Sequence, residues 1–152
     1  MRVFLVATDG SEGGTAAVRE AASLAAAHDA ELVVMTVIPR DGALRTSAGE
    51  IREFARTEHL SGQIEARSLI AEEILEQAKA IIGEPTDLKV TYISRAGDPA
   101  AEIVACAREC RAELLILGSR GQGALGAFLY GSVSGRVADA EPCTVKIVPA
   151  VK

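Results

Sequence analysis

Glycine and serine bring backbone amides and hydroxyls close to phosphate oxygens, and both are concentrated in GSRGQGALGAFLYGSVSG, which starts at residue 118. Two overlapping patterns can be recognised there. The short pattern, GQGALG over 121–126, matches the GxGxxG fingerprint of dinucleotide-binding proteins. The wide pattern has two glycines, a spacer of nine residues and a Gly-Ser pair, at Gly118, Gly121, Gly131 and Ser132.

The short pattern is the weaker candidate. A dinucleotide fingerprint follows its strand directly, and an acidic residue ends the next strand. Here the apolar strand ends at Leu117, too early for the tight turn, and the next strand ends at Val148 without a carboxylate. A P-loop is excluded because the chain has no Gly-Lys pair, and neither Ser119 nor Ser132 lies in the GxSxG motif of a hydrolase.

The wide pattern predicts a phosphate site made of free backbone amides and a helix end. Ser132 is a favourable N-cap for a helix over residues 133–138, whose positive end would face the ligand. The hydroxyls of Ser132 and Ser134 can donate to phosphate oxygens, and we expect Arg120 or Arg136 at the rim of the site.

A second group able to do chemistry lies near the amino terminus. Asp9 follows the apolar run Val3–Ala7, in the turn Thr8-Asp9-Gly10-Ser11. A carboxylate beside nucleotide phosphates can hold Mg²⁺, which prefers one or two carboxylates together with phosphate oxygens. The structural alternative for Asp9 is an N-cap or turn residue ahead of the first helix. The two roles are compatible, and we expect Asp9 to contact the ligand.

Around these motifs, short apolar runs alternate with helical patterns. Strands are expected over 3–7, 32–38, 88–93, 114–117 and 143–148. Helices are expected over 12–28 and from Asp98-Pro99, a favourable N-cap and first helical position. This alternation predicts an α/β fold, a Rossmann-like three-layer sandwich with helices on both faces of a five-stranded parallel sheet.

The hydrophobicity of the strands predicts their order. The runs at 3–7, 32–38 and 114–117 are apolar almost throughout, whereas those at 88–93 and 143–148 alternate with polar residues, as edge strands do. The order 3-2-1-4-5 satisfies this pattern. Winding then reverses between the first and fourth strands, so Asp9 and Gly118 should face each other across a crevice.

The segment from Pro39 to Ile82 is long for a crossover. We expect an amphipathic helix over 70–82 and a short helix near Ile51 and Phe54. The segment follows the second strand, where it could form either a lid over the ligand or a surface crossover without ligand contact. The sequence leaves both alternatives open.

Composition bounds the class of protein. The 152 residues, 49% apolar and 24% charged, fit one globular domain over 1–152. A net charge of −5 without a Lys/Arg cluster argues against a nucleic-acid partner, and no stretch reaches membrane-spanning length. The start lacks the apolar region of a secretory signal, and the three cysteines are an odd number, so we expect a cytoplasmic protein with reduced thiols. Cys106 and Cys110 are interpreted as small core residues rather than metal ligands.

Together these motifs resemble the universal stress protein family, in the branch that binds ATP, whose signature is G-x2-G-x9-G-[S/T]. The resemblance covers nearly the whole chain, from VFLVATDGSEGG through LVVMTVIP and LLILGSRGQGALGAFLYGSVS to the closing EPCTVKIV. It implies an adenine nucleotide hydrolase-like fold, a ligand that is ATP or else AMP or cyclic AMP, and a homodimer, often through the fifth strand.

The resemblance also implies roles for individual residues. Asp9 would contact the adenosine end of the ligand, and Val37 would meet the adenine through its backbone. The wide glycine pattern would hold the ribose and phosphates. The complete expected site comprises Ala7, Thr8, Asp9, Val37, Leu117, Gly118, Ser119, Arg120, Gly121, Gly131, Ser132, Val133 and Ser134.

Three functions remain as alternatives. The first is a cytoplasmic protein that binds an adenine nucleotide during stress, with Mg²⁺ held by Asp9. The second is a slow ATP hydrolase, for which the sequence offers Asp9 and Arg120 but no dedicated catalytic pair. The third is a nucleotide-free dimeric interaction module. One departure from the family, Cys143-Thr144-Val145 without the proline common in relatives, leaves the dimer mode open.

Overall fold

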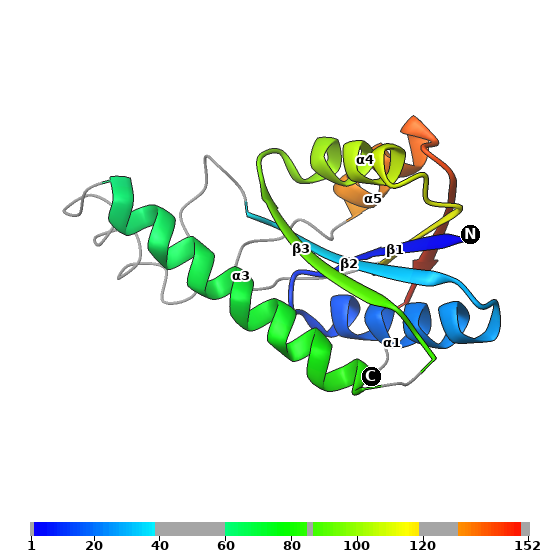
Figure 1. The fold of residues 1–152 in the computed structure, drawn as a ribbon. Coiled ribbons are helices and arrows are strands. Elements are labelled where there is room, and N and C mark those ends of the chain that lie inside the picture. Colours follow the sequence, from blue (N-terminus) through cyan, green and yellow to red (C-terminus); the bar gives the residue numbers. More distant parts are fainter. Residues whose placement is uncertain (1, 39–59, 85–86, 119–130, 150–152) are drawn as a thin grey trace.

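The computed structural model describes residues 2–38, 60–84, 87–118 and 131–149 (Figure 1). Five parallel strands form one sheet in the order β3-β2-β1-β4-β5, with bounds β1 (Val3–Ala7), β2 (Glu31–Ile38), β3 (Val90–Ala96), β4 (Leu114–Gly118) and β5 (Thr144–Val148). The α/β fold class and the strand order predicted from the apolar runs are both confirmed.

Helices cover both faces of the sheet. Figure 1 shows α1 (Glu12–Ala27) and α3 (Leu60–Ile82) on one face, and α4 (Pro99–Glu109) and α5 (Gly131–Ala140) on the other. Asp98 is the N-cap of α4 and Pro99 its first residue, as predicted. The three-layer arrangement therefore places every described helix against a sheet face that needs cover.

Each face of the sheet has its own apolar core, because successive residues of a strand point to opposite sides. Leu5 of β1 packs toward α4 with Ile103, whereas its neighbour Val6 packs toward α1 with Val18. All four side chains are at most 1% exposed. Burial on both sides explains why the central strands read as continuous apolar runs.

The strand that departs most from its predicted bounds is β3. We predicted residues 88–93, and the structure has Val90–Ala96. Its register explains the difference, because β3 pairs along β2 from Leu32 opposite Val90 to Ile38 opposite Ala96. The length of β2 therefore sets where β3 ends, and the local sequence of β3 does not contain that information.

Helix α3 reaches the carboxyl edge of the sheet. Its Ile74 packs on Ile38, the last residue of β2, and Ala78, one turn later, packs on the core beneath α1. The amino-terminal half of α3 therefore extends past the ends of the strands (Figure 1). The predicted short helix near Ile51 and Phe54 lies outside the described residues, as do residues 39–59 of the segment for which a lid was one alternative.

Among the helices that the structure describes, none combines the length and the apolar character needed to cross a membrane. The three thiols are unpaired. Cys106 is 1% exposed in the core beneath α4, as predicted, whereas Cys110 and Cys143 are half-buried beside it. Burial raises the pKa of the Cys106 thiol to about 11, so this thiol stays protonated and unreactive at neutral pH.

Candidate functional site

The turn between β1 and α1 holds its shape through its own side chains. The amide of Ser11 donates to Oδ1 of Asp9 at 3.0 Å, and the Ser11 hydroxyl donates to the same oxygen. The Ser11 hydroxyl in turn accepts the amide of Gly14 at 3.1 Å, which makes Ser11 the N-cap of α1. Asp9 is therefore a turn residue rather than an N-cap, and its side chain is fully buried.

Glycines allow this turn to be tight. Gly10 has φ +82°, and its amide donates to Oγ1 of Thr8 at 3.1 Å. A Cβ on Gly14 would collide with that same hydroxyl and lie 3.1 Å from the amide nitrogen of Asp9. The glycines of this turn thus keep α1 close enough to hold Asp9 in place.

The carboxyl end of β4 lies directly against the first turn of α1. A Cβ on Gly118 would lie 2.5 Å from the backbone carbonyl of Gly13, closer than packed atoms allow. This contact brings the Asp9 turn and the start of the glycine-rich loop together at the predicted crevice between β1 and β4. It also explains the glycine at position 118 without reference to a ligand.

Four of the expected site residues contribute their side chains to packing. All are buried in the core cluster on the α4 and α5 side of the sheet, and they are Ala7, Val37, Leu117 and Val133. Their places at the carboxyl ends of strands, or in the first turns of α5, leave backbone groups as their means of meeting a ligand. Thr8 and Ser134 are also buried, at 2% and 7% exposure.

Helix α5 differs in detail from its prediction. It begins at Gly131, so Ser132 lies in its first turn rather than at the N-cap, and it continues to Ala140 rather than ending near 138. Either Arg120, which lies outside the described residues, or Arg136 was expected at the phosphate rim. The guanidinium of Arg136 holds both carboxyl oxygens of Asp98, at 3.0 and 3.3 Å, across the α4–α5 contact. That pairing lowers the pKa of Asp98.

Three expected site residues, Ser119, Arg120 and Gly121, lie outside the described residues, as do Gly123 and Gly126 of the spacer. The described part of the site therefore consists of the Asp9 turn, the ends of β2 and β4, and the start of α5.

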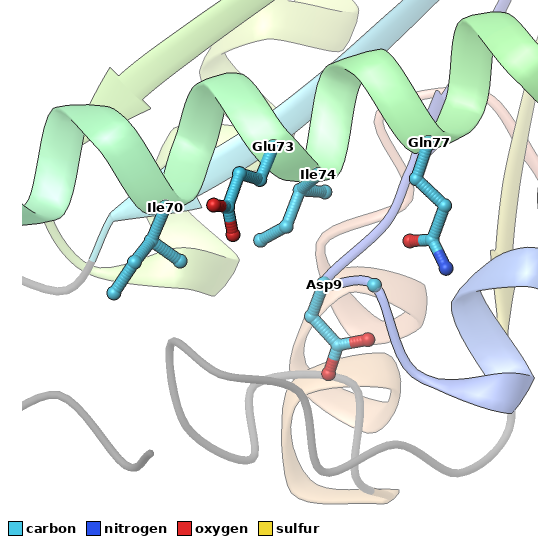
Figure 2. Close-up of a pocket in the computed structure, with 6 residues that line it drawn as sticks. Asp9, Ile70, Glu73, Ile74 and Gln77 are labelled. Atoms are coloured by element: carbon cyan, nitrogen blue, oxygen red, sulfur yellow. The ribbon is translucent and has the colours of Figure 1, made fainter.

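A cavity of about 330 Å³ opens beside the Asp9 turn on the side of α3. Figure 2 shows the residues that line it, and they are Asp9, Gly10, Ile70, Glu73, Ile74 and Gln77. Sequence reasoning missed the polar pair on α3. Their spacing of one helical turn was visible, but the side of the helix that faces the crevice depends on how α3 packs.

Across the described parts of the chain, no group of three or more His, Cys, Asp or Glu side chains could hold a metal ion by itself. Any divalent cation at Asp9 would need further ligands, such as phosphate oxygens.

Comparison with known proteins gives the family. The profile described as "Universal stress protein family" matches residues 1–149. The chain belongs to the universal stress protein family. It is 35% identical over 148 residues to the universal stress protein YxiE of Bacillus subtilis, covering 95% of this chain and 97% of that relative.

Solved structures agree with this assignment. The universal stress protein UspA from Lactobacillus plantarum superposes with a TM-score of 0.75 at 22% identity, covering 97% of each chain. A universal stress protein crystallised in complex with cAMP superposes with a TM-score of 0.60 at 28% identity, covering 99% of this chain and 98% of that one. The predicted membership of the universal stress protein family is confirmed by the profile match.

Proposed function

We propose that this universal stress protein is a cytoplasmic binding protein for an adenine nucleotide, with ATP as the principal ligand, held at the carboxyl ends of β1 and β4. The observation that carries the proposal is the Asp9 turn. A buried carboxylate, fixed by two hydrogen bonds from Ser11, follows β1 at the point where the sheet reverses its winding. The same residue lines a cavity between its turn and α3.

The charges of the site suggest how the nucleotide lies. Helix α5 begins at Gly131, and its N-terminus carries the partial positive charge of the helix dipole, which favours binding of phosphate there. The wall on the side of α3 carries the carboxylate of Glu73. We therefore place the phosphates toward the start of α5 and the end of β4, where a cation held by Asp9 can meet them, and the adenosine toward α3.

The residues present fit a magnesium–nucleotide complex. Mg²⁺ takes one or two protein carboxylates and completes its shell with phosphate oxygens and water. Asp9 can supply the protein carboxylate, because Ser11 holds its side chain in one orientation. The ion would neutralise phosphate charge where the chain itself is acidic. We accordingly expect ATP to bind more weakly in the presence of a chelator.

A relative supports the ligand class. The universal stress protein that was crystallised with cAMP aligns over 99% of this chain at 28% identity. An adenine nucleotide in this fold is therefore a realistic occupant, and AMP and cyclic AMP are the alternatives to ATP.

The test is to purify the protein gently, extract it with acid and identify the released nucleotide by mass spectrometry. The key variant is Gly131→Asp, which places a carboxylate at the first residue of α5. Gly135→Asp is its matched control, one turn further along the same helix, where an added Cβ meets nothing within 4 Å. We expect near-stoichiometric ATP in the parent and in Gly135→Asp, and none in Gly131→Asp.

Two other outcomes are informative. Recovery of AMP or cyclic AMP would keep the site and change the ligand. A parent that carries no nucleotide and also ignores added ATP would contradict the proposal and favour an interaction module.

We further propose a homodimer through the outer edge of β5. In the described sheet β5 pairs with β4 on one side only, and its Ile147 is 39% exposed. An open edge with an exposed apolar residue can pair with a second copy. Sedimentation velocity should show a dimer that Ile147→Lys weakens. The control Leu69→Lys changes the other exposed large apolar residue of the described chain and should leave the dimer intact.

A further inference from the structure

We propose that Glu73 and Gln77, two polar residues of α3, select the ribose of the bound nucleotide by accepting hydrogen bonds from its hydroxyls. The inference rests on the proposed function, because it assigns one wall of the same site. That wall comes from the segment between β2 and β3 and is independent of the glycine signature.

The packing of α3 brings these side chains to the ligand side of the sheet. Ile74 packs on Ile38, the last residue of β2, so this turn of the helix lies at the carboxyl edge. Glu73 and Gln77 are one helical turn apart and line the cavity beside Asp9. Figure 2 shows both side chains leaving α3 on the side where the Asp9 turn lies.

Gln77 lies against the backbone of the turn itself. A Cβ on Gly10 would come within 3.4 Å of Oε1 of Gln77 and 3.2 Å of Cγ1 of Ile74. Because position 10 carries no side chain, the turn passes under α3 at close range. The amide oxygen of Gln77 is thereby held next to the residue that follows Asp9.

The charge of this wall determines which half of a nucleotide fits. Carboxylates only accept hydrogen bonds, and Glu73 brings one to the cavity. Asp9 also lines the cavity, but its buried carboxylate lies on the side of the turn that faces away from α3 (Figure 2). Among the described residues, no lysine or arginine forms an ion pair with Glu73. A phosphate placed beside the Glu73 carboxylate would be repelled, whereas ribose hydroxyls are neutral donors.

Size and surroundings agree with a sugar at this position. The volume of about 330 Å³ is at the lower end of the range of ligand pockets, about 300–1,000 Å³. The aliphatic side chains of Ile70 and Ile74 supply apolar wall between the polar groups. Thr36, on the same sheet face as Ile38, has a fully buried hydroxyl with no partner among the described residues, a further polar group beneath α3.

A consequence for specificity follows. ATP and AMP present two free ribose hydroxyls, whereas in 3′,5′-cyclic AMP the 3′ oxygen is esterified to phosphate. The acceptors on α3 should therefore favour ATP and AMP over cyclic AMP, and they should also favour ATP over 2′,3′-dideoxy-ATP.

The experiment is a thermodynamic cycle in which a side chain of α3 is truncated and the ribose hydroxyls of the ligand are removed, separately and together. Dissociation constants of ATP and of 2′,3′-dideoxy-ATP are measured by calorimetry for the parent, Glu73→Ala and Gln77→Ala. Glu72→Ala is the matched control, because Glu72 is the exposed neighbour of Glu73 and does not line the cavity. We expect the parent to prefer ATP by at least tenfold, and Glu73→Ala to reduce that preference by about tenfold. Gln77→Ala should reduce it about threefold, and Glu72→Ala not at all.

The outcomes separate the two proposals. If the parent binds ATP and Glu73→Ala keeps the full preference over the dideoxy ligand, the assignment of α3 is wrong and the proposed function stands. If both ligands weaken equally in Glu73→Ala, the residue supports the fold of the site without reading the ribose, which also overturns the inference. If the parent binds neither ligand, the proposed function fails and the inference fails with it.

Discussion

Two helices of this protein begin at the carboxyl edge of the sheet with an oxygen-bearing N-cap, and their surroundings differ. At α4 the cap is Asp98, whose side chain is 48% exposed, accepts the amide of Ala101 and pairs with Arg136. At α1 the cap is Ser11, whose hydroxyl is held by Asp9, a carboxylate buried beside a cavity.

The difference indicates that Asp98 stabilises a helix, whereas Asp9 belongs to a candidate binding site. The Asp98 carboxylate uses its oxygens on its own helix and on a neighbouring one. At α1 the desolvation free energy is larger, because burying the Asp9 carboxylate is unfavourable unless partners compensate for the lost water. A buried carboxylate at a topological switch point is a functional candidate, whereas an exposed, paired cap is explained by helix stability alone.

The largest effect is expected from the glycine that packs under the Asp9 turn. Gly14→Ala would drive a Cβ into the Thr8 hydroxyl, so the free energy of unfolding should fall by about 2 kcal/mol despite better helix propensity. Gly135→Ala, in a helix with open space around the new Cβ, should raise it by about 0.5 kcal/mol. Urea unfolding measures the free energy of unfolding of both variants. Equal changes in the two would show that the packing at Gly14 is no tighter than at Gly135.

An intermediate effect distinguishes the two carboxylates. Asp9→Asn keeps an oxygen for Ser11 and removes the charge, so we expect ATP with Mg²⁺ to bind about tenfold more weakly. Asp98→Asn should leave the affinity within about twofold of the parent, because the exposed cap has no ligand to hold. Calorimetric titration measures the ATP affinity of both variants. A similar loss of affinity in both would show that Asp9 is no more a ligand residue than Asp98 is.

The smallest effect is a pH dependence at α4. The hydrogen bonds from Arg136, and then the amide of Ala101, lower the pKa of Asp98 in the folded protein. A lowered folded-state pKa means that this stabilisation is complete above the unfolded value, about 3.9, and is lost as the pH falls through the folded value.

This pH dependence can be isolated by a variant. Because the pair is exposed and screened, Asp98→Asn should cost only about 0.5 kcal/mol at pH 7. The gap between parent and variant should narrow as the pH falls below about 3.9 and close only below the folded-state pKa of Asp98, as measured by urea unfolding over a series of pH values. A gap that does not narrow at all below the unfolded value would show that the charge of Asp98 contributes nothing.

Much of this molecule could be predicted because its signals are local. Apolar runs buried on both faces identified β1, β2 and β4, and Asp98-Pro99 marked the start of α4. The predictions that failed depend on distant partners. The bounds of β3 follow the length of β2, and α5 begins at Gly131 rather than after an N-cap at Ser132.

By itself the sequence determined the alternation of elements, the strand order and therefore the crevice at which Asp9 and Gly118 meet. These follow from hydrophobic periodicity and chain connectivity, which are properties of the chain read in order. Only the tertiary structure decided that Gly14 and Gly118 are glycines because backbone and side chains press against them. It also decided that Glu73 and Gln77 face the Asp9 turn, because the rotation of a helix is set by what it packs on.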